Sequence, residues 1–320
     1  MSVRISIVTT VYRSAATITE FIERALQAAD QVGYDAELIV VDDGSPDASA
    51  EIVCDVVDKD PRVRLVRLSR NFGHHKAMLT GLKHANGDLI FLIDSDLEEP
   101  PELLNGMSEF MHKTPVDCLY GVQKKRKGGR VEQVTGKIFY SFFNNLSEVE
   151  LPKNVSTVRL MTKRYVDSLL AFKDKSPVFV PLSLLAGYPQ AAYVFEKSEK
   201  SETTYSLGRR IGLMILAITS FSSRPLLLMF YLSLILCFMG LLYGLYVVLM
   251  GLFVETRGGW SSLMAVVVFF FSLNAVFTGL IGLYLKQVLE EVKDRPITVV
   301  QEVYERRSNT AGLVHNETGA

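Results

Sequence analysis

The segment that most constrains the fold of this chain is a run of five apolar residues that ends in two aspartates. Residues 89–93 have the length and composition of a strand buried on both faces, and Asp94, Ser95 and Asp96 follow directly. In an extended chain residues i and i+2 point the same way, so we expect Asp94 and Asp96 to hold one cation while Ser95 points elsewhere. Two carboxylates completed by substrate phosphates suit Mg²⁺, and Mn²⁺ accepts the same ligands. The pair is a candidate metal site, with an ordinary solvated Asp-X-Asp as the alternative.

Strands and helices alternate before this segment. Strands are predicted over 4–12, 37–41 and 63–68, with helices starting near Ile18, spanning 49–58 and covering 78–85. This alternation predicts an α/β fold with a parallel sheet, which binds ligands at the carboxyl ends of its strands. Asp42 and Asp43 end the second strand as Asp94 ends the fourth. Two acidic strand ends together predict one nucleotide-binding crevice, whereas residues 43–47 alone would fit a turn with a helix N-cap.

Apolar residues make up 48% of the 320 residues, and their excess lies in two stretches. Residues 226–254 and 261–285 hold almost no charge, and each is long enough to cross a hydrocarbon core of ~30 Å. Arginine and lysine residues precede the first stretch and follow the second, which predicts cytoplasmic N- and C-termini. The formal net charge of −1 gives no argument for a nucleic-acid partner. The three cysteines are far apart and fit neither a disulfide framework nor a metal site.

Five short motifs follow one another along the chain in an order typical of one family. They are Asp42–Ser45, Arg70–His74, Gly87–Asp88, Asp94–Glu98 and Pro100–Glu102. This ordered set resembles the family-2 GT-A glycosyltransferases, and more narrowly the polyprenyl-phosphate glycosyltransferases of the dolichol-phosphate mannose synthase group with two C-terminal membrane helices. The resemblance implies a Rossmann-like, nucleotide-sugar-binding GT-A domain over 1–206. It also implies an interfacial amphipathic helix over 207–224, two transmembrane helices over 225–286 and a cytoplasmic tail over 287–320.

The resemblance assigns roles to individual residues. Those implied for donor binding are Thr10, Tyr12, Asp42, Asp43, Arg70, Asn71, Asp94, Ser95 and Glu98. Asp94 and Asp96 would hold Mg²⁺ or Mn²⁺ on the diphosphate, and with Arg159 they are the residues implied for catalysis. The candidates for binding the acceptor phosphate are Lys124, Arg126, Arg159, Thr204 and Tyr205.

The activity implied is transfer of a single sugar from a nucleotide-sugar donor to a polyprenyl phosphate, undecaprenyl or dolichyl. The reaction would occur at the cytoplasmic face of the inner membrane, in cell-envelope glycan or glycoconjugate modification. The expected partners are the donor, the lipid acceptor and the membrane, with no nucleic acid and with a homo-oligomer left open.

Two positions depart from the family pattern. Glu98 stands where glutamine is common, and Thr157 stands where an acidic residue is expected. A lipid monophosphate is already an anion at neutral pH, so its attack needs no carboxylate to remove a proton. The departures nevertheless leave an alternative from another class, a non-catalytic membrane scaffold or regulator that retains the fold. A processive polysaccharide synthase is disfavoured, because Trp260 lies beside the predicted extracytoplasmic loop and not in a Gln-x-x-Arg-Trp helix.

Overall fold

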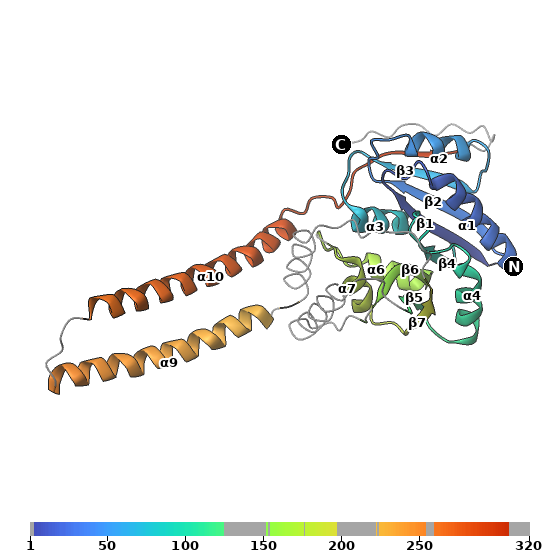
Figure 1. Cartoon of the computed structure of the whole chain (residues 1–320). Coiled ribbons are helices and arrows are strands. Elements are labelled where there is room, and N and C mark those ends of the chain that lie inside the picture. Colours follow the sequence, from blue (N-terminus) through green and yellow to red (C-terminus); the bar gives the residue numbers. More distant parts are fainter. Residues whose placement is uncertain are drawn as a thin grey trace.

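The computed structural model describes residues 3–124, 152, 154–175, 177–196, 222, 224–253 and 259–306. These residues build an eight-stranded mixed sheet with the order β7-β5-β6-β4-β1-β2-β3-β8 (Figure 1). The strands are β1 (Arg4–Val11), β2 (Asp35–Asp42), β3 (Val63–Leu68), β4 (Leu89–Leu92), β5 (Cys118–Gln123), β6 (Val155–Thr162), β7 (Gln190–Phe195) and β8 (Val300–Glu305).

The core of the sheet is parallel, which confirms the predicted α/β fold. β1 pairs in parallel with β2 and with β4, and β2 pairs in parallel with β3. Successive residues of β1 are buried on opposite faces: Ile7 packs in one hydrophobic cluster and Val8 in the other, and both are 0% exposed. A strand covered on both faces must be apolar at successive positions, and the β1 sequence meets that requirement.

Helices cover both faces of this sheet. The first cluster joins one face to α1 (Ile18–Val32), α2 (Ser49–Val57) and α4 (Leu103–Lys113). The second joins the other face to α3 (His74–His84), α6 (Lys163–Leu170) and α7 (Phe179–Leu185). Because helices cover both faces of the sheet, a ligand can reach the parallel strands only at their ends. In open α/β sheets the ligand site lies at the carboxyl ends.

The antiparallel strands extend the sheet beyond β4. β6 pairs with both β4 and β5, and its register sets Arg159 opposite Leu92, the last residue of β4. This pairing brings a segment distant in sequence to the strand end that leads into Asp94.

The two predicted apolar helices are present as α9 (Arg224–Phe253) and α10 (Trp260–Val292). Each contains a stretch long and apolar enough to cross a membrane, and none of the most apolar window of either helix is buried. The pair extends away from the sheet (Figure 1). They are therefore not core helices of a soluble domain, which would be buried. The predicted interfacial helix falls on residues 207–224, of which only Ser222 and Arg224 are described.

The chain returns to the sheet after α10. β8 pairs antiparallel with β3, with Val303 opposite Val66. The sheet therefore gains an edge strand from the far end of the sequence (Figure 1).

Candidate active site

The acidic segment after β4 leaves the extended conformation earlier than predicted. β4 ends at Leu92, and Ser95 and Asp96 lie in a turn. The buried Ser95 hydroxyl donates to the Thr10 carbonyl at 2.9 Å, while the exposed Asp96 accepts from the Glu98 N–H at 2.9 Å. Asp94 and Asp96 therefore do not share one face of a strand as expected, because a turn relates them, and their role as a metal pair stays a prediction. Ser95 does point elsewhere, toward β1.

His74 connects the ends of β1 and β4. Its Nδ1 lies 3.0 Å from Thr10 Oγ1, and its Nε2 lies 3.3 Å from Asp94 Oδ1. The imidazole therefore lies between the end of β1 and the carboxylate that follows β4. His74 belongs to one of the motifs, but it was not among the predicted site residues. Its place at the first position of α3, just past the carboxyl end of β3, is the signal that could have identified it.

Asp43 joins the loops that follow β2 and β3. Its Oδ1 accepts from the Phe72 N–H at 2.7 Å and its Oδ2 from the Gly73 N–H at 3.0 Å. Burial raises the pKa of Asp43, against the lowering effect of these two bonds. Both oxygens are thus engaged in holding the loop before α3, and a direct contact with a donor stays a prediction.

Gly44 lets the same two loops approach closely. Its φ is +67°, and a Cβ placed there would lie 2.5 Å from the carbonyl carbon of Arg70 and 2.7 Å from the Asn71 nitrogen. Only glycine tolerates both the positive φ and this proximity. The predicted residues Arg70 and Asn71 are therefore held against the end of β2, where Asp42 lies.

Asp42 is buried, with 0% exposure. Its Oδ1 accepts from the Ser45 N–H at 3.0 Å, and its Oδ2 lies 3.6 Å from Arg67 Nε and makes no hydrogen bond. Buried carboxylate oxygens normally have a hydrogen-bond donor. A nucleobase N–H is one group that fits this oxygen, so the contact predicted between Asp42 and a nucleoside remains a prediction with chemical support.

The remaining donor candidates lie around these strand ends. Tyr12, directly after β1, is 45% exposed. Arg70 is exposed, and its guanidinium lies 4.3 Å from the centre of the Phe72 ring, while Asn71 is also exposed. These side chains are accessible to a ligand that reaches the ends of β1, β2 and β3.

Arg159 lies inside the protein. It is 1% exposed, and its Nη1 donates to the carbonyls of Ser156 at 3.1 Å and Thr157 at 3.0 Å. Its Nη2 donates to Ser183 Oγ at 3.3 Å, and burial lowers the pKa of the guanidinium. Arg159 thus ties β6 to α7, and its contact with a substrate stays a prediction.

The acceptor-phosphate candidates are only partly covered by the structure. Lys124 Nζ lies 3.0 Å from Glu196 Oε1 on the surface. Arg126, Thr204 and Tyr205 lie outside the described residues.

The carboxylates at the end of β4 fit a metal only in combination with a substrate. Across the described ranges no three His, Cys, Asp or Glu side chains are close enough to hold a metal ion. Asp94 is partly exposed, at 27% of its side chain, and Asp96 is exposed. One or two carboxylates plus substrate phosphates are a usual set for Mg²⁺, so Asp94 and Asp96 fit an ion completed by a diphosphate.

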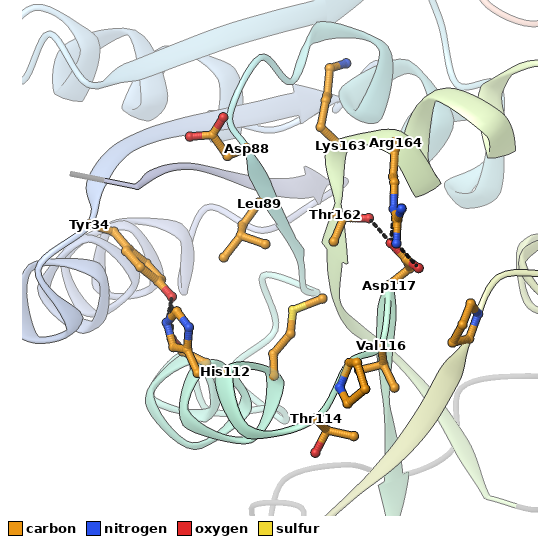
Figure 2. A pocket seen from close by; sticks show the side chains of 14 residues that line it. Tyr34, Asp88, Leu89, His112, Thr114, Val116, Asp117, Thr162, Lys163 and Arg164 are labelled. Carbon is orange, nitrogen blue, oxygen red and sulfur yellow. Dashed lines mark hydrogen bonds and ion pairs between the residues drawn. The ribbon is translucent and has the colours of Figure 1, made fainter. Parts of the chain in front are cut away.

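A cavity of about 520 Å³ lies at the other end of β4 (Figure 2). Asp88 and Leu89, at the start of that strand, line it together with Asp117. The polar groups there bind one another: Asp117 accepts from Arg164 Nε at 2.5 Å and from Thr162 Oγ1 at 2.9 Å, as Figure 2 shows. The cavity is therefore separate from the acidic strand ends.

Comparisons with known proteins place the chain in a family. Residues 6–170 match the model of glycosyl transferase family 2. A protein of Mycobacterium tuberculosis described as "Putative glycosyltransferases" is 39% identical over 94% of this chain and 88% of its own length. The undecaprenyl-phosphate 4-deoxy-4-formamido-L-arabinose transferase of Shewanella sediminis is 28% identical over 98% and 96% of the two chains. The prophage bactoprenol glucosyl transferase homolog of Escherichia coli is 27% identical over 94% of this chain and 99% of its own length.

The matched residues contain most of β1, all of β2 to β4, the acidic strand ends and Arg159. The resemblance drawn from the motifs is therefore confirmed, and this chain belongs to glycosyl transferase family 2.

Proposed function

We propose that this protein transfers a single sugar from a nucleotide-sugar donor to a polyprenyl phosphate at the cytoplasmic face of a membrane. The observation that carries the proposal is the contact network at the carboxyl ends of the parallel strands. Thr10, His74 and Asp94 join β1, α3 and the end of β4, while Asp43 and Gly44 join the loops after β2 and β3. In open α/β sheets ligands bind at this edge.

The donor would lie along this edge with its nucleoside toward β2 and its diphosphate toward β4. Asp42 offers a buried carboxylate oxygen without a hydrogen-bond donor, and Arg70 and Asn71 lie beside it. Asp94 and Asp96 would hold Mg²⁺ or Mn²⁺ against the diphosphate. When bound, the ion neutralises charge that develops on the departing diphosphate. His74, whose Nε2 lies 3.3 Å from Asp94 Oδ1, would stand beside this ion.

The acceptor is inferred from the membrane helices and from the relatives. α9 and α10 have the length and apolar composition of membrane spans, and the Shewanella and Escherichia relatives are named for undecaprenyl phosphate and bactoprenol. A phosphate oxygen of the lipid would attack the anomeric carbon, and the bond from that carbon to the nucleoside diphosphate would break. Because the lipid phosphate is already an anion, no side chain needs to accept its proton. This is why Thr157 is compatible with catalysis.

One observation favours the non-catalytic alternative. Arg159, predicted to stabilise the leaving diphosphate, donates to main-chain carbonyls in the interior. A scaffold that retained the fold would keep such a buried arginine and lose transfer.

The two functions are separated by a transfer assay. The full chain in lipid nanodiscs containing a short polyprenyl phosphate is incubated with a panel of labelled nucleotide sugars and Mn²⁺. We expect one sugar to enter the lipid fraction, and Asp94→Asn and Asp96→Asn to lower turnover by at least about a hundredfold. The matched control is Glu109→Gln, which removes an exposed carboxylate of α4 paired with Lys113. Transfer by neither wild type nor control with any sugar of the panel would favour the scaffold. Transfer undiminished in both aspartate variants would disprove the assigned metal site.

A further inference from the structure

The C-terminal strand brings one acidic side chain to the nucleoside end of the candidate site. β8 pairs with β3 along its length, and Glu302 lies opposite Arg67. Glu302 Oε1 is 3.5 Å from Arg67 Nη1. On its other side, Arg67 Nε is 3.6 Å from Asp42 Oδ2. Glu302, Arg67 and Asp42 thus form a continuous row of alternating charges from the edge of the sheet to its second strand.

Asp42, at the inner end of this row, is the residue whose charge must be compensated. Asp42 is 0% exposed, and a buried carboxylate is costly unless a cation or hydrogen-bond donors compensate for its lost hydration. Arg67 is the cation within reach among the described residues. Its side chain is 32% exposed, so the guanidinium has room to turn toward solvent. Glu302 on one side and Glu51, 3.7 Å from Nη2, on the other restrict that movement.

The strand itself is held by contacts that do not involve the row. Tyr304 donates to Asp58 Oδ1 at 2.8 Å, and Thr298 Oγ1 lies 2.7 Å from Thr80 Oγ1. Glu305 lies 3.9 Å from Arg64, which binds Glu37 away from the acidic strand ends. Replacing Glu302 should therefore leave β8 in place.

The same strand is tied to the membrane helix. Residues 293–299 connect the end of α10 to β8. The Lys175 N–H donates to Glu291 in the last turn of α10 at 2.9 Å, and Lys175 Nζ donates to Asp294 in the connection at 2.6 Å. The end of the second apolar helix and the nucleoside end of the site are thus linked by a short segment of the chain.

We propose that β8 is a positioning element of the donor site, in which Glu302 and Arg67 act through Asp42. This proposal rests on the proposed function, since it assigns the nucleoside of a nucleotide sugar to Asp42. Glu302 touches no substrate. Its effect is to keep Arg67 beside Asp42, so that the carboxylate is oriented before the nucleoside arrives.

The test measures nucleotide affinity and the two Michaelis constants separately. Purified full-length protein is titrated calorimetrically with uridine, guanosine and cytidine diphosphates in the presence of Mn²⁺, as wild type, Glu302→Gln and Glu305→Gln. Glu305→Gln is the matched control, because it removes a carboxylate of the same strand that pairs with Arg64 and not with Arg67. We expect Glu302→Gln to raise the Kd of the preferred nucleoside diphosphate about two- to fivefold, the range of an exposed ion pair. The KM for the donor should rise similarly, with the KM for the lipid acceptor unchanged.

A double-mutant cycle with Arg67→Met distinguishes positioning from general stability. Arg67→Met alone should raise the Kd about tenfold, the equivalent of about 1.4 kcal/mol. If Glu302 acts only through Arg67, adding Glu302→Gln to that variant should change nothing further. Equal affinities for Glu302→Gln and Glu305→Gln, or additive effects in the cycle, would overturn the inference while the transfer activity stands. Failure of wild type to bind any of the three diphosphates would overturn the proposed function together with the inference.

Discussion

Gly44→Ala tests whether the close contact between the loops after β2 and β3 is required for nucleotide binding. Gly44 has a φ of +67°, and the added Cβ would lie 2.5 Å from the Arg70 carbonyl carbon and 2.9 Å from Arg70 Cα. Those neighbours are backbone atoms, which cannot turn aside as the end of a flexible side chain can. The loop that begins at Arg70 must therefore move away from the end of β2.

The magnitude follows from two terms. The left-handed conformation costs a residue with a Cβ about 1–2 kcal/mol relative to glycine. Moving the loop also strains the bonds that Asp43 accepts from Phe72 and Gly73, and a hydrogen bond to a charged group contributes about 1.5–3 kcal/mol. We expect Gly44→Ala to lower the free energy of unfolding by about 2.5–5 kcal/mol if one of these two bonds is lost.

Gly33→Ala is the matched control. Gly33 ends α1 with a φ of +80°, and a Cβ there would meet nothing within 4 Å. It should therefore cost only the conformational term of about 1–2 kcal/mol. Thermal unfolding followed by circular dichroism gives the difference in stability, and calorimetry with a nucleoside diphosphate gives the difference in affinity. We expect Gly44→Ala to weaken nucleotide binding at least about tenfold and Gly33→Ala to leave it unchanged. If the two variants lost the same stability and bound the nucleotide equally well, the contact between the two loops would not be required for binding.

Three further predictions concern pH, packing and topology. Burial lowers the pKa of His75 to about 4 from its ordinary 6.5. Between these two pH values the unfolded chain therefore binds more protons than the folded protein. The free energy of unfolding should fall by up to about 3 kcal/mol as the pH drops from 6.5 to 4. His75→Gln should reduce that loss in acid-unfolding curves, and an identical loss would contradict the assignment. Asp117→Asn should lower the free energy of unfolding by about 1–3 kcal/mol, because it weakens the hydrogen bonds from Arg164. The KM for the donor should stay unchanged. A changed KM would show that the cavity of Figure 2 takes part in the reaction. The variant Gly259→Cys should react with an impermeant maleimide at the new thiol in intact cells while Cys54 stays protected, and the reverse pattern would invert the predicted topology.

The parallel core could be predicted because its signals are local. An apolar run such as residues 89–93 is long enough to identify a buried strand, and the observed strand differs by a single residue at its end. The two apolar helices were predictable for the same reason, since length and lack of charge suffice.

The geometry of the candidate site was less predictable, because it depends on turns. Periodicity placed Asp94 and Asp96 at the end of a strand, but the change to a turn at Ser95 is set by its bond to Thr10 on another strand. Likewise, Asp43 looked like a ligand for a donor, and only the tertiary structure shows its oxygens engaged by Phe72 and Gly73. A carboxylate that binds a loop and one that binds a ligand have the same sequence pattern.

The C-terminal strand was not predicted at all. Residues 300–305 read Val-Gln-Glu-Val-Tyr-Glu, a short, mixed segment with weak strand character. It forms a strand because the edge of β3 is available to it, and the bond from Arg67 to Glu302 spans 235 residues of sequence. Nothing local in residues 287–320 indicates that partner.

The central claim is that the acidic strand ends hold a nucleoside diphosphate through a divalent cation. The most direct measurement is calorimetric titration of the full-length wild type, Asp94→Asn and Asp96→Asn with a nucleoside diphosphate, in Mn²⁺ and in EDTA. We predict binding by wild type in Mn²⁺, at least about tenfold weaker binding in EDTA, and a similar loss in either variant even with Mn²⁺ present. Binding of equal strength with and without Mn²⁺, unaffected by both substitutions, would contradict the claim.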